Sequence, residues 1–169
     1  TKFGDVPPLA AFGSGYKFHV TGLNKLPDGF PTTKAEYVQA EEERQIRKVT
    51  ANIDEIVEFE EFKLEDAEIC VVAYGSTSRS ARYAVNEARE KGIKAGMFRI
   101  KTFWPFPDKQ IKALAEKVKG FIVPEMNLGM CSLEIERCAQ GKAQILGINR
   151  VDGEPINPEQ ILEKMKEVK

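Results

Sequence analysis

The stretch ICVVAYGSTS, residues 69–78, decides the fold class of this chain. Its first part, residues 69–74, is a continuous apolar run, which is typical of a parallel strand whose two faces are both covered by helices. The small and hydroxylated residues that follow indicate a turn. Apolar residues over 81–88 then recur at helical spacing. The sequence therefore predicts a buried strand followed by a helix from about residue 78 to 91, with Gly92 as its stop signal.

The same alternation of strand and helix continues to the end of the chain. Further strands are predicted at 95–100, 121–124 and 143–148. The helices between them are predicted to begin at Asp108, as an N-cap with Gly120 as the stop signal, after Asn127, and at Asn157-Pro158, where Pro is favoured in the first turn. This order predicts an α/β fold, with a sheet of four or five strands and helices on both faces.

The segment before this alternation is different in kind. Residues 1–33 are rich in Gly and Pro, as in Val6-Pro7-Pro8, and lack a sustained period. They nevertheless carry large apolar side chains, which we expect a missing domain or subunit to cover. These are Phe3, Leu9, Phe12, Tyr16, Phe18, Val20, Leu23 and Phe30. A long amphipathic helix is predicted next, from Thr33 as N-cap, with Glu36 as its capping-box partner, to about Val57.

Composition excludes several classes of function. The 25 basic and 26 acidic residues leave a net charge of -1 without a basic block, so nucleic acid is not an expected partner. No apolar run approaches the roughly 20 residues that cross a bilayer, and no secretory signal is visible, so we expect no membrane partner and a cytoplasmic location. The first residue is Thr1 rather than Met, which is compatible with a processed or partial polypeptide.

Two groups of residues are candidates for ligand or partner contact. The turn Tyr74-Gly75-Ser76-Thr77-Ser78-Arg79 joins a strand to a helix, where free backbone N–H groups can hold a phosphate or carboxylate. The alternative is purely structural. Gly75 would permit the turn and Ser76 or Thr77 would cap the helix, since neither a GxGxxG motif nor a Walker lysine is present.

The second group follows the later strands, at the edge where open α/β sheets place ligands and partners. Glu125 and Asn127 follow one strand, although a solvated loop in which Asn127 caps the next helix explains the same residues. Trp104 lies among phenylalanines and prolines in residues 102–107, which suits either an interface anchor or a lid packed on its own domain.

Independent catalytic chemistry is not supported. His19 is the only histidine and lies in the arm without an evident acid or nucleophile beside it, which argues against a catalytic triad. The cysteines are Cys70, Cys131 and Cys138. Three cysteines cannot supply the four ligands of a cubane iron–sulfur cluster, and we expect Cys131 and Cys138 to be small core residues.

Four separate motifs, in order along nearly the whole chain, resemble one family. They are FHVTGL at 18–23, VAYGS at 72–76, KTFWPFP at 101–107 and VPEMNLG at 123–129. Together they are similar to the carboxyl-terminal part of the alpha subunit of 2-oxoacid:ferredoxin oxidoreductases, most closely the 2-oxoglutarate type. The resemblance implies a three-layer α/β/α sandwich with a mostly parallel sheet, like the transketolase carboxyl-terminal domain, preceded by an extended arm and a long helix.

The resemblance also implies a function and its partners. Members of the family oxidatively decarboxylate a 2-oxoacid to an acyl-CoA and reduce ferredoxin. Thiamine diphosphate, magnesium and the iron–sulfur cluster are then expected elsewhere in the complex and not in this chain. About half of an alpha subunit is expected to precede Thr1. Beta and also gamma or delta subunits would be partners, ferredoxin and CoA would bind through the complex, and pairing between copies stays an alternative.

In this interpretation the chain has three parts. Residues 1–33 are the arm from the preceding domain, 34–62 the connecting helix and 63–169 the α/β domain, which serves assembly and has no activity alone. The competing hypothesis is a free-standing α/β domain that binds an anionic nucleotide or a CoA-like ligand at the carboxyl ends of its strands.

Overall fold

A computed structural model describes residues 10–169 of the chain. The chain divides into two compact units, and the boundary lies between Ala51 and Asn52. The predictions for Val6-Pro7-Pro8, Phe3 and Leu9 lie outside the described residues.

The second unit is built on one five-stranded sheet in the order β1-β3-β2-β4-β5. β2 pairs in parallel with β3 and with β4, and β4 pairs in parallel with β5, whereas β1 is antiparallel to β3. The strands are β1 (Phe59–Phe62), β2 (Ile69–Tyr74), β3 (Ala95–Ile100), β4 (Gly120–Glu125) and β5 (Gln144–Asn149). The mostly parallel α/β sheet is confirmed.

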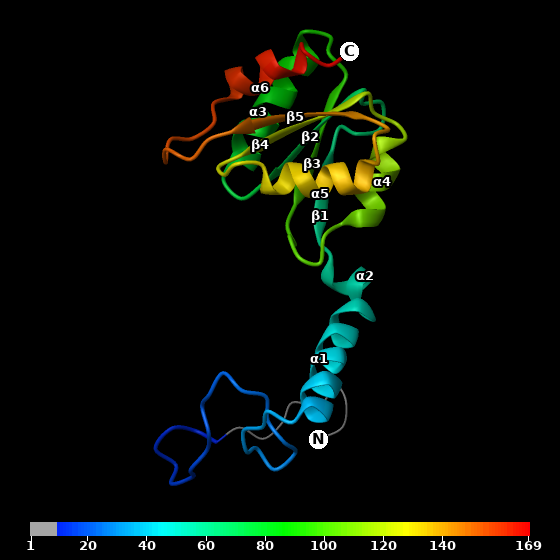
Figure 1. Cartoon of the computed structure of the whole chain (residues 1–169). Coiled ribbons are helices and arrows are strands. Elements are labelled where there is room, and N and C mark those ends of the chain that lie inside the picture. Colours follow the sequence, from blue (N-terminus) through cyan, green and yellow to red (C-terminus); the bar gives the residue numbers. More distant parts are fainter. Residues whose placement is uncertain (1–9) are drawn as a thin grey trace. The chain divides into compact units, whose positions relative to one another are not determined.

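Helices cover both faces of this sheet, which gives three layers (Figure 1). α3 and α6 pack over one core and α4 and α5 over the other. Their bounds are α3 (Thr77–Glu90), α4 (Asp108–Ala115), α5 (Met130–Ala139) and α6 (Pro158–Met165). Cys131 and Cys138 are buried in the core under α4 and α5, which confirms the prediction that they are small core residues.

Several helix ends differ from the predictions. Asp108 is the first residue of α4 and Pro107 holds the N-cap position, so Asp108 is not the predicted N-cap. The guanidinium of Arg137 donates to the Asp108 carboxylate at 2.6 and 2.7 Å. Gly120 belongs to β4 and does not end the helix. At α6 the prediction is confirmed, since Pro158 is its first residue and Asn157 N donates to Gln160 Oε1 at 2.9 Å.

The predicted continuous helix before the sheet is wrong in its extent. It is divided into α1 (Ala35–Thr50) and the short α2 (Ile53–Ile56), and the chain then enters β1. Thr33 does not cap α1, because Lys34 holds the N-cap position without a side-chain hydrogen bond. At the other end of α1 the Thr50 hydroxyl donates to the Ile46 carbonyl oxygen at 3.1 Å, a local bond that favours helix termination.

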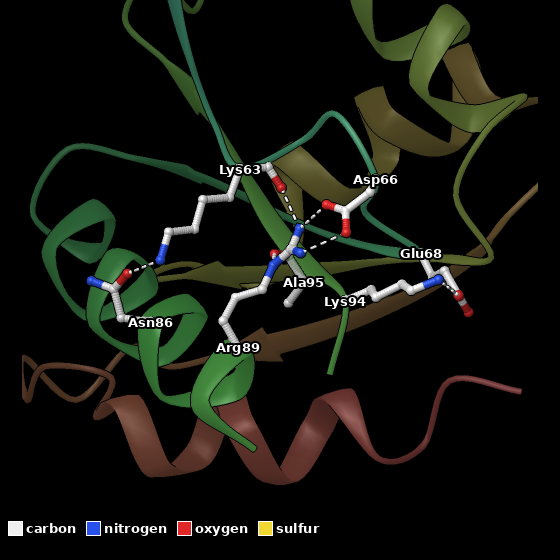
Figure 2. Close-up of polar contacts among 7 residues, drawn as sticks. All are labelled: Lys63, Asp66, Glu68, Asn86, Arg89, Lys94 and Ala95. Carbon is white, nitrogen blue, oxygen red and sulfur yellow. Dashed lines mark hydrogen bonds and ion pairs between the residues drawn. The ribbon is translucent and has the colours of Figure 1, made fainter. Parts of the chain in front are cut away.

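The amino edge of the sheet is held by one arginine of α3. Arg89 donates to the carbonyl oxygens of Ala95 at 2.6 Å and Lys63 at 2.7 Å and forms an ion pair with Asp66 at 2.7 Å (Figure 2). Arg89 thus joins the end of α3 to the start of β3 and to the loop after β1. Gly96 is required beside this loop, since a Cβ there would lie 2.5 Å from the Lys63 carbonyl oxygen.

The first unit has little core in its described part. Lys25 and Pro31 form an isolated antiparallel bridge, and no residue of α1 is buried. The large apolar side chains of the predicted arm that the structure describes are all exposed, namely Phe12, Tyr16, Phe18, Val20, Leu23 and Phe30. Ring contacts between Phe12 and Phe18 and between His19 and Phe30 cover this apolar surface only in part.

Candidate functional site

The carboxyl ends of β2, β3 and β4 meet at one edge of the sheet. Tyr74, the last residue of β2, pairs with Ile100, the last residue of β3, and Glu125 closes β4. The segments that leave these strands are residues 75–76, 101–107 and 126–129. The edge therefore gathers Tyr74, Gly75, Ser76, Trp104, Glu125 and Asn127, whereas the predicted candidates Thr77 and Arg79 lie in the first turn of α3.

Glu125 is the buried anchor of this edge. Its side chain is fully buried and its carboxylate accepts three hydrogen bonds from the first turn of α5. Cys131 N donates to Oε2 at 2.8 Å, while Ser132 N and Ser132 Oγ donate to Oε1 at 3.1 and 2.7 Å. A carboxylate at a helix N-terminus is stabilised by unpaired N–H groups and by the helix dipole. The alternative of a solvated loop is therefore wrong for Glu125, and its side chain, a predicted candidate for ligand or partner contact, is fully buried in this structure.

Asn127 fixes the loop between β4 and α5. Its Oδ1 accepts hydrogen bonds from Gly129 N at 3.0 Å and Met130 N at 2.8 Å, but Gly129 and not Asn127 holds the N-cap position of α5, so the predicted cap by Asn127 is wrong in its position. Gly129 has φ of +103°, a conformation that favours glycine. Asn149, which sequence reasoning did not single out, donates from Nδ2 to the Asn127 carbonyl oxygen at 3.1 Å.

Tyr74 links this loop to the aromatic loop after β3. Asn127 Nδ2 donates to the Tyr74 hydroxyl oxygen at 2.6 Å, and the Tyr74 ring meets the Phe103 ring edge-on at 5.0 Å. Burial, and then the negative charge of Glu125, raise the pKa of the Tyr74 phenol above its ordinary value. The phenol therefore stays protonated at neutral pH and remains able to donate a hydrogen bond of its own.

The turn after β2 has a structural role that accounts for part of its sequence. Gly75 has φ of +57°, and the Thr77 hydroxyl donates to the Tyr74 carbonyl oxygen at 2.7 Å. Ser76 occupies the N-cap position of α3 without a side-chain capping bond, so a cap by either hydroxyl is not what the structure shows. The Ser78 hydroxyl is buried and has no hydrogen-bond partner within residues 10–169.

Exposed apolar side chains surround this edge. Trp104 is 67% exposed, so it is not a lid packed on its own domain, whereas its neighbour Phe103 packs against Tyr74 and Phe106. The segment Met-Asn-Leu-Gly-Met at 126–130 supplies three more exposed apolar side chains, and its large apolar residues in a loop were the sequence signal for them. We call the exposed set the carboxyl-edge patch: Trp104, Met126, Leu128, Met130 and Leu133.

The structure brings together some of the predicted candidates. Tyr74 and Asn127 are hydrogen-bonded, and the Ser76 hydroxyl lies 4.0 Å from the Met126 sulfur. Arg79 is exposed on α3. None of these contacts joins a nucleophile to a general base.

Metal and membrane features are not found in the part of the chain that the structure describes. Residues 10–169 hold no cluster of three or more His, Cys, Asp or Glu side chains that could bind a metal ion. No described helix is long and apolar enough to cross a membrane. The three thiols are free and buried, and burial raises the pKa of Cys131 to about 12.

Comparison with known proteins places this geometry in a family. Residues 67–161 match the family model of the pyruvate:ferredoxin oxidoreductase core domain II. The 2-oxoglutarate synthase subunit KorA of Methanocaldococcus jannaschii is 39% identical over 156 residues, which are 92% of this chain and 42% of that subunit. KorA of Methanothermobacter thermautotrophicus is 40% identical over 158 residues, which are 93% of this chain and again 42% of that subunit.

A solved structure agrees with these relatives. The 2-oxoglutarate:ferredoxin oxidoreductase from Magnetococcus marinus superposes with a TM-score of 0.73 at 25% identity, over 95% of this chain and 28% of that one. A split-gene transketolase, at 16% identity and a TM-score of 0.55 over 62% of this chain and 39% of that one, shares the fold. This chain spans 42% of the length of the KorA subunits that it matches. The chain belongs to the family of the pyruvate:ferredoxin oxidoreductase core domain II.

Proposed function

We propose that this chain is the carboxyl-terminal part of an alpha-type subunit of a 2-oxoacid:ferredoxin oxidoreductase and that it serves subunit assembly. The observation that carries the assembly role is the exposure of Trp104, 67% of whose surface is open at the carboxyl edge of the sheet. Tryptophan is enriched at the centres of protein interfaces, where it buries a large apolar surface. The remaining apolar residues of the carboxyl-edge patch support the same role.

The reaction we propose for the whole enzyme is the oxidative decarboxylation of a 2-oxoacid, such as 2-oxoglutarate, to its acyl-CoA with reduction of ferredoxin. The names of the KorA relatives support this substrate class, and the Magnetococcus enzyme was solved with 2-oxoglutarate, coenzyme A and succinyl-CoA bound. Thiamine diphosphate, magnesium and the iron–sulfur cluster would be held elsewhere in the complex. The purified chain, given all these components, is expected to show no 2-oxoacid-dependent reduction of ferredoxin. Turnover above a boiled control would contradict the assembly role.

The partners we propose are the beta subunit and gamma or delta subunits, with ferredoxin and CoA reaching the enzyme through the complex. The exposed apolar side chains of the arm support the proposal that a partner or preceding domain covers residues 1–33. In this proposal residues 34–62 are a connecting segment and residues 63–169 are the α/β domain. Three buried, unpaired thiols are compatible with the reducing cytoplasm.

The test of the assembly role is the substitution Trp104→Ala in the complex formed by co-expression with the partner subunits. If Trp104 is a central anchor, the substitution should weaken assembly by about 2 kcal/mol, or roughly thirtyfold in affinity. Because the side chain is mostly exposed, the melting temperature of this chain should stay almost unchanged. Tyr83→Ala is the matched control, since Tyr83 of α3 is also exposed, at 56%.

The two measurements are needed together. Co-purification and analytical centrifugation report assembly, and thermal melting of the isolated chain reports folding. A Trp104→Ala chain that melts much lower but assembles normally would show that Trp104 supports the fold, and would contradict the interface assignment.

A second candidate function is anion binding at the start of α3. The specific observation is the buried Ser78 hydroxyl, which has no partner among the described residues, next to the exposed Arg79. A phosphate or carboxylate of a nucleotide or CoA-like ligand would be bound there by α3 N–H groups. Calorimetry with CoA, thiamine diphosphate and adenine nucleotides tests it, and a stoichiometric isotherm that Arg79→Ala abolishes would favour this function over assembly alone.

A further inference from the structure

The two edges of the sheet differ in charge. β1, at one edge, carries Glu60 and Glu61, and Arg82 forms an ion pair with Glu60, which protects that edge against pairing with another strand. β5, at the other edge, has the sequence QILGIN and contains no charged residue. An uncharged edge strand of this length is a template for β-pairing.

The backbone hydrogen bonds at the two ends of β5 show which of its groups face outward. Gln144 N donates to the Lys119 carbonyl oxygen at 2.9 Å and Arg150 N to the Glu125 carbonyl oxygen at 3.2 Å, both toward β4. Since backbone groups alternate in direction along a strand, the even-numbered residues between them also face β4. The N–H and C=O groups of the odd-numbered residues 145, 147 and 149 therefore point away from the sheet, and within residues 10–169 they have no hydrogen-bond partner.

We propose that β5 pairs antiparallel with β5 of a second copy of this chain, across a two-fold axis at Gly147. Outward-facing residues must face one another, so this register places Gly147 opposite its own counterpart and Ile145 opposite Asn149. Leu146 then lies opposite Ile148, an apolar cross-strand pair. The five-stranded sheets of the two copies become one continuous sheet.

Charges beyond the ends of β5 favour an axis at Gly147 over an axis at Leu146. With the axis at Gly147, Lys142 faces Asp152 of the second copy, and the same contact occurs twice because of the symmetry. Moving the axis to Leu146 would place Lys142 opposite Arg150, two like charges. Moving it to Ile148 would place Lys142 opposite Glu154, again two opposite charges, but would place Arg150 opposite the apolar Leu146. Opposite charges across paired strands stabilise the pairing and like charges destabilise it.

The contact also extends charge pairs that exist within each copy. Lys142 forms an ion pair with Glu116, and Arg150 forms one with Asp152 at 2.7 Å. In the paired sheet these charges alternate in sign from one copy to the other. The occupant that fits this edge is therefore the same edge of a second copy. This inference does not rest on the proposed function, because β5 and the carboxyl-edge patch are separate features.

Charge reversal tests the register in the full 169-residue chain. Lys142→Glu and Asp152→Lys, each alone, place like charges opposite one another at both symmetric contacts, and we expect each to raise the dimer dissociation constant about tenfold. The two substitutions together restore the contact between copies but not the pairs with Glu116 and Arg150 within each copy. The double variant should therefore dimerise as the unchanged chain does. Lys166→Glu, beside Glu163 on α6, is the matched control and should leave dimerisation unchanged.

Sedimentation equilibrium measures these constants, and disulfide trapping checks the geometry. Paired strand residues have Cα atoms about 4.5–5.5 Å apart, within the range of a disulfide. A mixture of Leu146→Cys and Ile148→Cys chains, which are changed at facing positions within β5, should form a covalent dimer. Neither chain alone should, because the two-fold axis does not bring position 146 or 148 next to itself. A chain that stays monomeric up to roughly 0.5 mM, or a dimer that the charge reversals leave unchanged, overturns the proposal.

Discussion

Glu125→Gln should destabilise the α/β unit, although it only replaces one carboxylate oxygen by an amide NH₂ group. The buried carboxylate accepts hydrogen bonds from Cys131 N at 2.8 Å and from Ser132 N and Oγ at 3.1 and 2.7 Å. An amide keeps one acceptor oxygen and places an NH₂ donor against an N–H donor of α5. Hydrogen bonds to a charged group contribute about 1.5–3 kcal/mol each, and the helix dipole adds about 0.3–1 kcal/mol. Removing the charge also relieves its desolvation cost, so we expect a net loss of about 2 kcal/mol.

Urea unfolding followed by far-ultraviolet circular dichroism measures this loss. With a denaturant slope of about 2 kcal/mol per molar urea, the midpoint should fall by about 1 M. Glu136→Gln is the matched control, because Glu136 lies on the exposed side of the same helix and should change the free energy of unfolding by less than about 0.5 kcal/mol. A Glu125→Gln midpoint within about 0.3 M of the unchanged chain would refute the stabilising role of this carboxylate.

Two further predictions concern other parts of the sheet unit. Gly96→Ala should lower the free energy of unfolding by about 1–3 kcal/mol, because its Cβ would lie 2.5 Å from a backbone oxygen of the loop after β1. Gly22→Ala is the control and should leave the free energy of unfolding unchanged, because Gly22 lies in open space. Equal urea midpoints for the two variants would contradict this prediction. The Arg137 guanidinium lowers the pKa of Asp108, so this pair should stabilise the fold above the unfolded pKa of about 4 and lose that contribution as pH falls through the lower folded pKa. The loss of stability below pH ~4 should therefore be smaller in Arg137→Gln, and an unchanged pH dependence of the melting temperature would exclude the effect.

The sequence determined the strands that are buried on both faces. The predicted strands at 69–74 and 95–100 match β2 and β3 residue for residue. The run at 69–74 is apolar throughout, as expected for a strand covered by helices on both faces, whereas 95–100 is apolar except at Arg99. Four ordered motifs also indicated the family, which the match over 67–161 shows. These features are local in the chain, so a pattern of residue types is enough to predict them.

β1 was missed because its signal is not local. Residues 59–62 read FEEF, and the two central glutamates resemble a solvated end of the preceding helix. Only the antiparallel pairing of Phe59 with Ile100 makes this segment a strand. Long-range partners of this kind do not appear in the sequence near the strand itself.

The carboxyl edge shows the same division between sequence and tertiary structure. The positions of Tyr74, Trp104, Glu125 and Asn127 after their strands already predicted that they would share an edge. The burial of Glu125 and the exposure of Trp104 were decided by packing. Three donors of α5 make it favourable to bury a carboxylate, whereas the aromatic ring is left exposed because Phe103 occupies the contact with Tyr74.

The order of the strands was likewise decided only by tertiary structure. Sequence alone predicted alternating strands and helices, but not that β1 and β5 would form the two edges. That order depends on which helices cover each face and on the two cores that they share with the sheet. It leaves the uncharged residues 144–149 at an open edge of the sheet, where they can pair with another strand. The sequence alone does not show that these residues form an edge strand.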